Sequence, residues 1–177
     1  MHNIALIAVL LAASFVGVAA AEEIRPADTH FFHESFGDLT EELEIARADG
    51  KFGVMVMFEA NDCPWCVRMM KNIMNRASVQ DYYRKHFQIV LINVDGDTLL
   101  TDFKGNQVME KEFALKHNRI RATPTFLFFD LNGDLTTRYT GTTKDIEEFL
   151  WLGEYVVDGR YKDEKFIRYK RNRRQSS

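Results

Sequence analysis

Cys63 and Cys66 are the only cysteines in this chain of 177 residues, and they enclose a proline and a tryptophan in the sequence Cys-Pro-Trp-Cys. Two cysteines at this spacing can form half of a metal site, a structural disulfide or a reactive dithiol. A structural zinc site needs four ligands, and the sequence has no second cysteine pair. His30 and His33 have a suitable spacing, but they lie in a segment far from the cysteines in sequence. We therefore expect neither a metal nor another cofactor.

The structural disulfide is also a weak explanation for the cysteine pair. Closing a loop of about four residues removes little entropy from the unfolded chain, and a chain of this length can bury a core without such a link. A reactive dithiol has a mechanism, because Cys63 directly precedes a predicted helix. Unpaired amide groups and the positive end of the helix dipole favour a thiolate there, and Pro64 suits the first helical turn. We predict that Cys63 and Cys66 form a redox-active pair.

The elements around the dithiol predict an α/β domain. Continuous apolar runs indicate buried strands at residues 52–59, 88–95 and 125–130. Helical periodicity and capping residues predict helices over 38–50, 64–87 with a break near 77–78, 108–117, and from Thr143 onward. An Asn-Gly turn predicts a hairpin after the third strand. This order predicts a three-layer α/β/α sandwich with a mixed sheet of four to five strands, and Gly96–Gln107 is expected to be a polar loop.

An apolar strand, then Cys-Pro-Trp-Cys opening a helix, then Ala-Thr-Pro-Thr about 60 residues later before a hairpin, resembles the thioredoxin superfamily. The resemblance extends over residues 36–157. It implies that Pro124 is cis and faces the dithiol, and that Thr123 offers backbone groups to an extended substrate. It also implies that Pro64 and Trp65 shape the surface that a substrate contacts.

One position departs from thioredoxin in a way that concerns catalysis. The buried aspartate that thioredoxin carries six residues before its first cysteine is replaced here by Met57. Glu59 follows on the same face of the strand by period-two alternation and could take over the proton transfer, because burial would raise its pKa. The alternative is a carboxylate at the strand end that faces solvent or pairs with a lysine.

The resemblance implies thiol–disulfide exchange. The Cys63 thiolate attacks a partner disulfide, and Cys66 resolves the mixed disulfide. Strongly oxidising relatives often have a histidine where this chain has Trp65, which favours a reductant or a mild exchanger. SoxW-type periplasmic thioredoxins are the most similar group. They imply a membrane electron donor of the DsbD or CcdA kind and protein disulfides as substrates, including components of sulfur oxidation or cytochrome maturation. A thioredoxin-fold docking or chaperone module and a disulfide-forming oxidase remain the alternatives.

The N-terminus predicts export. Residues 4–20 are apolar or small and precede two glutamates, which is typical of a signal peptide over about residues 1–21. The segment is short for a bilayer span, although its start lacks Lys and Arg, so a retained anchor helix is the alternative. Export to the periplasm or outside the cell would let disulfides persist. The predicted domain then covers residues 22–159.

Charge is unevenly distributed along the chain. The net charge is −3, with 46% hydrophobic and 28% charged residues, so nothing indicates a nucleic-acid partner. Residues 160–177, however, carry eight Lys or Arg against Asp163 and Glu164. We expect this basic C-terminal tail to be mainly solvated, with a possible weak contact to a membrane or an acidic partner.

Overall fold

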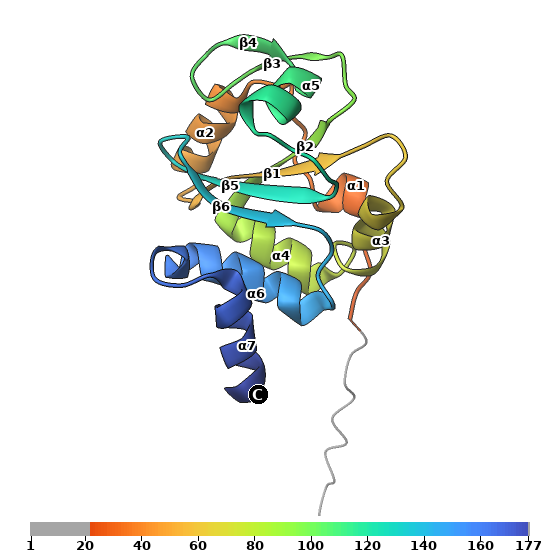
Figure 1. Ribbon diagram of the computed structural model, residues 1–177, viewed down its shortest axis with the longest axis vertical. Helices are drawn as coiled ribbons and strands as arrows, with labels where there is room; N and C mark the ends of the chain where they lie inside the picture. The colour runs from red at the N-terminus through yellow and green to blue at the C-terminus, as the bar shows by residue number, and fades with distance from the viewer. Residues whose placement is uncertain (1–21, 177) are drawn as a thin grey trace, which may run out of the picture.

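A computed structural model describes residues 22–176, and its centre is a four-stranded mixed sheet (Figure 1). The strand order is β2-β1-β5-β6, in which β1 is parallel to β2 and β5 is antiparallel to both its neighbours. The strands are β1 (Gly53–Glu59), β2 (Phe87–Asn93), β5 (Thr125–Asp130) and β6 (Leu135–Thr140). The predicted mixed α/β architecture is confirmed.

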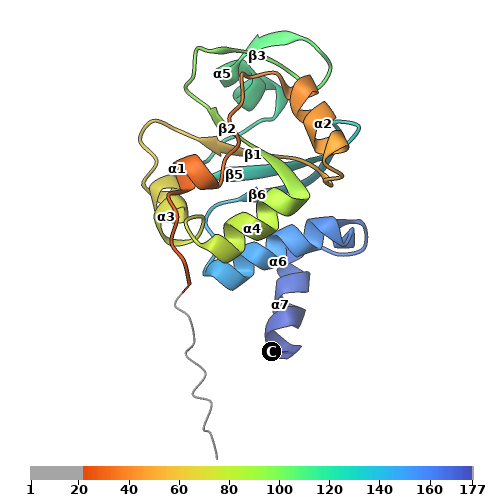
Figure 2. The ribbon, with the colours of Figure 1, turned by 180° about the vertical axis from the view of Figure 1, so that it is seen from behind.

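Helices cover both faces of this sheet and complete the three layers (Figures 1 and 2). One face packs against α1, α3, α4 and α6, and the other against α2, α5 and the π-helical turn η1. Their bounds are α1 (Ala27–His30), α2 (Leu39–Ala48), α3 (Pro64–Asn72), α4 (Ala77–His86), α5 (Glu110–Glu112), η1 (Phe113–His117) and α6 (Ile146–Val157).

The central strand β1 is buried on both faces because its side chains alternate between the two cores. Met55 and Met57 belong to the core under α3, α4 and α6, which also contains both cysteines. Val56 and its neighbours on the opposite face belong to the core under α2 and η1. Packing on both faces therefore fixes the strand, which ends at Glu59, four residues before Cys63.

The helix boundaries agree with the sequence signals, with small differences. Asp38 caps α2 by accepting hydrogen bonds from the backbone of Thr40 and Glu41. The predicted break in the helix after the cysteines occurs at residues 73–76, a few positions early. The last predicted helix begins at Ile146 with Asp145 as its cap, rather than at Thr143.

The Gly96–Gln107 segment is more ordered than a polar loop. It contains β3 (Leu99–Thr101), which pairs with β4 (Gln107–Met109) in a second, two-stranded sheet. The buried Asp102 carboxylate accepts hydrogen bonds from the backbone of Lys104 and Asn106 and closes the turn between the strands. Strands of three residues are too short to show a periodic pattern, which explains why the sequence suggested a loop.

The described part of the basic segment, residues 160–176, is mostly exposed, as expected of a solvated tail, but it is folded and attached to the domain. It forms a 3-10 turn, η2 (Arg160–Lys162), and a helix, α7 (Phe166–Ser176), that stands against α6 (Figure 1). Tyr169 is buried, and its ring lies 5.4 Å from that of Tyr155 on α6. Phe166 and Tyr169 are three residues apart and so share one face of α7. This face packs against Tyr155 and attaches the helix to α6.

None of the helices between residues 22 and 176 is both long and apolar enough to cross a membrane. The predicted signal peptide, residues 1–21, lies outside the described part of the chain.

Candidate active site

Cys63 and Cys66 form a disulfide at the first turn of α3. Cys63 is the N-cap of this helix and Pro64 occupies its first turn, as the sequence predicted. The backbone N–H of Cys66 donates a hydrogen bond to Cys63 Sγ at 3.1 Å. A helix N-terminus carries unpaired N–H groups and a partial positive charge, so this position stabilises negative charge on the Cys63 sulfur when the disulfide is reduced.

The two cysteines differ in their exposure to solvent. Cys63 retains 7% of its surface, whereas Cys66 retains 1% and faces the core with Met69. Cys63 is therefore the more exposed of the two cysteines. This asymmetry is what an attacking and a resolving thiol require.

The Thr123–Pro124 segment lies against the dithiol although it is 60 residues away in sequence. The peptide bond between them is cis, and the Thr123 hydroxyl donates a hydrogen bond to Cys63 Sγ at 3.2 Å. Gly141, which follows β6, donates its N–H to the carbonyl of Pro124 at 2.8 Å and has a positive φ of 99°. Sequence reasoning missed Gly141; its signal was a glycine directly after the second strand of the hairpin.

Pro64 and Trp65 are exposed beside the sulfurs. Trp65 keeps 54% of its surface, and the Arg68 guanidinium lies 5.6 Å from the centre of its ring. A cation at this distance contributes a modest attraction at an exposed site and orients the ring. The structure thus brings Pro64, Trp65, Thr123 and Pro124 to the region of the dithiol, and their part in binding substrate stays a prediction.

Glu59 ends β1 four residues before Cys63 and is half-buried. Burial raises its pKa, and the nearby carboxylate of Glu110 raises it further. Burial of the Glu110 side chain likewise raises the pKa of Glu110. No Lys, Arg or His side chain in residues 22–176 forms an ion pair with Glu59, so the lysine-paired alternative does not apply to the described structure. A role in proton transfer stays a prediction.

The histidines considered as metal ligands have other partners. His33 Nδ1 accepts a hydrogen bond from the backbone of Ile89 at 3.0 Å, and its ring lies near Lys51. Burial, followed by the charges of Arg84 and Lys51, lowers the pKa of His33 to about 4. His30 contacts its neighbour Thr29. Across the described residues, no group of three His, Cys, Asp or Glu side chains could hold a metal ion.

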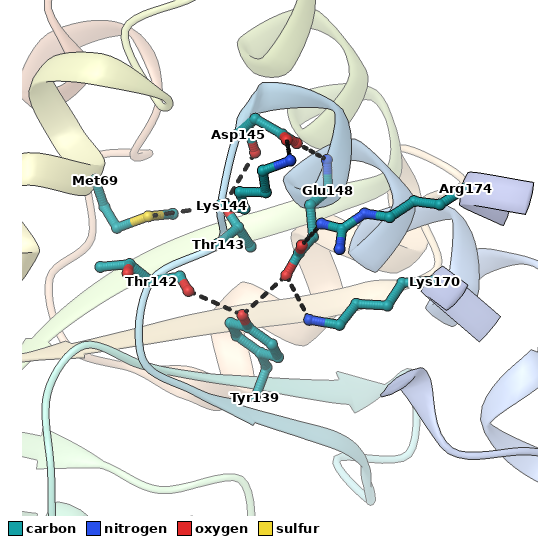
Figure 3. Close-up of polar contacts among 9 residues, drawn as sticks. All are labelled: Met69, Tyr139, Thr142, Thr143, Lys144, Asp145, Glu148, Lys170 and Arg174. Carbon is teal, nitrogen blue, oxygen red and sulfur yellow. Dashed lines mark hydrogen bonds and ion pairs between the residues drawn. The ribbon is translucent and has the colours of Figure 1, made fainter. Parts of the chain in front are cut away.

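The buried carboxylate of Glu148 was absent from the sequence predictions (Figure 3). Glu148 on α6 is 2% exposed; it pairs with Lys170 at 2.7 Å and with Arg174, both on α7. The Tyr139 hydroxyl lies 3.4 Å from the same carboxylate and 3.0 Å from the carbonyl of Thr142. Glu148 therefore links α7 to the loop after β6 that contacts Pro124.

The fold and the site agree with comparisons to known proteins. The thioredoxin-like domain profile matches residues 39–157. The chain belongs to the thioredoxin-like family. A search of curated proteins gave no match. Together, the family and the Cys63/Cys66 pair of this thioredoxin-like protein support thiol–disulfide oxidoreductase activity in general terms.

Solved structures share the fold at low sequence identity. A thioredoxin-fold protein from Helicobacter pylori has a TM-score of 0.58 and 22% identity, covering 72% of this chain and 86% of its own. A thioredoxin from Thermus thermophilus has a TM-score of 0.52 and 25% identity, covering 66% and 82%. A protein described as DsbH oxidoreductase has a TM-score of 0.52 and 18% identity, covering 80% and 92%.

Proposed function

We propose that this thioredoxin-like protein is an exported thiol–disulfide oxidoreductase that reduces or exchanges disulfides in other proteins. The observation that carries the proposal is the unequal pair of sulfurs at the start of α3. Cys63 is the accessible one, it caps the helix, and it accepts a hydrogen bond from Thr123 beside a cis-proline. This arrangement supplies a nucleophile, a resolving group and a place for a substrate backbone.

In the reducing direction, the Cys63 thiolate attacks one sulfur of a partner disulfide, breaks that bond and releases the first partner thiolate. Cys66 then loses its proton, attacks Cys63 Sγ and expels the second partner thiolate. The products are the Cys63–Cys66 disulfide and a reduced partner, so two electrons pass to the partner. Glu59 is the carboxylate we propose as acceptor of the Cys66 proton, because its raised pKa lets it exchange protons closer to neutral pH.

We propose a reducing or mildly exchanging role rather than a strongly oxidising one. Trp65 occupies the position where strongly oxidising relatives often have histidine. A reductant outside the cytoplasm must be recharged, so the proposal includes a membrane electron donor of the DsbD or CcdA kind. Membership of the SoxW-type group and periplasmic protein disulfides as substrates are part of the same proposal. The predicted signal peptide, residues 1–21, supports export.

The test combines turnover with trapping. The wild-type protein should accelerate insulin reduction by dithiothreitol, and Cys63→Ser should abolish this acceleration because no sulfur is left to attack. Cys66→Ser should form stable mixed disulfides with proteins of an exporting cell, whereas a Cys63→Ser/Cys66→Ser double variant should form none. A docking or chaperone module would show no cysteine-dependent turnover, and that result would refute the proposal.

The direction of electron flow needs a second measurement. Equilibration of the Cys63–Cys66 couple with glutathione should give a reduction potential near that of thioredoxin, about −270 mV, rather than near that of DsbA, about −120 mV. A value close to the DsbA figure would make the protein an oxidase and would overturn the reducing assignment while leaving disulfide exchange intact.

A further inference from the structure

An apolar groove runs along α3 beside the dithiol. It has a volume of about 520 Å³ and lies between α3 and the segment that leads into α1. Ile24, Pro26 and Ala27 line one side, and Val67 and Met70 line the other. Both ribbon views show α1 next to α3 (Figures 1 and 2). The groove is therefore built in part by residues that precede the part of the chain matched by the thioredoxin-like domain profile.

Backbone hydrogen bonds hold in place the wall of the groove that is formed by residues 24–27. Arg25 donates its N–H to the carbonyl of Asn75 at 2.9 Å, and Ala77 donates to the carbonyl of Glu23 at 3.0 Å. The Arg25 guanidinium also pairs with Asp81 at 2.8 Å. These contacts attach the wall to the junction of α3 and α4, so the groove exists before any ligand arrives, as is usual for binding sites.

The groove leaves apolar side chains open to solvent. Ile24 is 61% exposed and Val67 is 48% exposed, and the neighbouring Trp65 is 54% exposed. Large apolar side chains that gather at one place on a surface mark an interaction site. Asp28 and Lys71 add one charge of each sign to the lining, so the groove has no net charge that would select a nucleic acid or a charged peptide.

The groove lies about one to two helical turns from Cys63 along α3. Val67 and Met70 follow Cys63 by four and seven residues, and residues four and seven apart share one face of a helix. At about 1.5 Å of rise per residue, the two side chains lie about 6 and 10 Å along the helix from Cys63. Any polypeptide joined to Cys63 in a mixed disulfide therefore has its backbone within reach of the groove.

We propose that this groove binds an apolar side chain of the polypeptide whose disulfide Cys63 attacks. An extended chain advances about 3.3 Å per residue, so the bound side chain stands about two to three residues from the attacked cysteine. The inference rests on the proposed exchange reaction and names its substrate class: protein disulfides with a neighbouring leucine, valine, isoleucine or similar residue.

The test measures the rate constants with which the reduced full chain reacts with two synthetic peptide disulfides. Both are symmetric dimers of a nonapeptide with one central cysteine. One peptide carries leucine at the second and third positions on each side of the cysteine, and the other carries serine at these positions. The expected result is a second-order rate constant about tenfold larger for the leucine peptide, since an apolar side chain leaves water. Met70→Glu should remove most of this preference, and so should Val67→Glu.

Matched controls separate binding from folding and chemistry. Leu135→Glu replaces an apolar side chain outside the groove, 47% exposed, at the start of β6 and at the opposite end of that strand from the residue that pairs with Thr125, and should keep the preference. Reaction with 2-hydroxyethyl disulfide needs no groove, so its rate should be equal in wild type and all three variants. Far-ultraviolet circular dichroism and urea midpoints verify that each variant is folded.

Failure of this inference is distinguishable from failure of the proposed function. If wild type reduces 2-hydroxyethyl disulfide but treats the two peptides alike, the groove proposal is overturned and disulfide exchange stands. A groove already covered by a second copy or by residues 1–21 would also overturn it, since the peptides would then react alike; sedimentation would identify a dimer. If wild type reduces none of the three disulfides, the proposed function itself fails.

Discussion

Glu59 and Glu148 are two carboxylates withdrawn from water in different ways. Glu148 is 2% exposed and meets the cations of Lys170 and Arg174. Glu59 is half-buried at the end of β1, and its charged neighbour is the carboxylate of Glu110. A buried carboxylate paired with two cations joins structural elements, whereas burial and a neighbouring acid make Glu59 hold its proton more tightly. The first arrangement serves architecture and the second can serve proton transfer.

This difference also explains why the C-terminal helix is attached. Glu148 makes contacts on two sides: its backbone N–H donates to the Asp145 carboxylate at 2.8 Å, and its side chain receives Lys170 and Arg174 (Figure 3). Tyr139 connects the same carboxylate to Thr142 in the loop that contacts the cis-proline. The helix α7 is thus connected through Glu148 and Tyr139 to the loop after β6.

The largest effect is expected when Glu148 loses both cations. The double variant Lys170→Met/Arg174→Met leaves a buried carboxylate without a cationic partner, which should lower the free energy of unfolding by about 3 kcal/mol, the low end for a broken buried pair. The low end applies because the Arg174 side chain is 40% exposed. Urea unfolding at pH 7 measures the change.

The control for this double variant lies on or next to the same helix. Lys165→Met/Arg171→Met removes two positive charges that form no ion pair within the described residues, and it should change the free energy of unfolding by less than about 0.5 kcal/mol. Equal losses for the two double variants would mean that Glu148 does not depend on its cations, and the comparison would fail.

A smaller loss is expected when the carboxylate is neutralised and its cations remain. Glu148→Gln keeps the shape of the side chain and a hydrogen-bonding oxygen, and Lys170 and Arg174 retain 18% and 40% exposure. These cations can reach water, so the free energy of unfolding should fall by about 1–2 kcal/mol. Urea unfolding of Glu148→Gln and of Lys170→Met/Arg174→Met under the same conditions compares the two losses in free energy of unfolding. A greater loss from Glu148→Gln would contradict the prediction.

The smallest effect on stability, and one of opposite sign, is expected at Glu59. Its pKa is raised in the folded protein, so the folded state binds this proton more tightly than the unfolded state, and stability falls as pH rises through the raised pKa. Glu59→Gln removes this titration. The variant should be more stable than wild type above the folded pKa and gain nothing from the lost titration well below the unfolded value. Urea unfolding at a series of pH values measures the difference.

The Glu59 prediction has a chemical readout as well. If Glu59 accepts the proton of Cys66, Glu59→Gln should slow resolution of the mixed disulfide and remove an inflection from its pH–rate profile. Glu110→Gln serves as the control, because it should lower the pKa of Glu59 and shift that inflection to lower pH without removing it. An unchanged profile in both variants would assign the proton to another group.

Local signals were sufficient for the reactive centre and most of the sheet. Cys63, Pro64 and the preceding apolar strand specify a cysteine at a helix N-terminus, because the strand, the turn and the cap are decided within a few residues. Continuous apolar runs identified β1, β2 and β5 for the same reason. The resemblance to the thioredoxin superfamily then supplied the cis-proline at Pro124, which no local pattern requires, since few X-Pro bonds are cis.

The remaining features depend on contacts between distant residues. Three features join segments whose local sequence does not predict that they meet. They are the pairing of Glu148 with Lys170 and Arg174, the contact of Gly141 with Pro124, and the groove between Ile24 and Met70. Residues 160–176 look like a solvated basic tail until the buried Glu148 is known. The charges of Lys170 and Arg174 attach α7 because packing buries their partner Glu148. That burial depends on the tertiary structure and not on the local sequence.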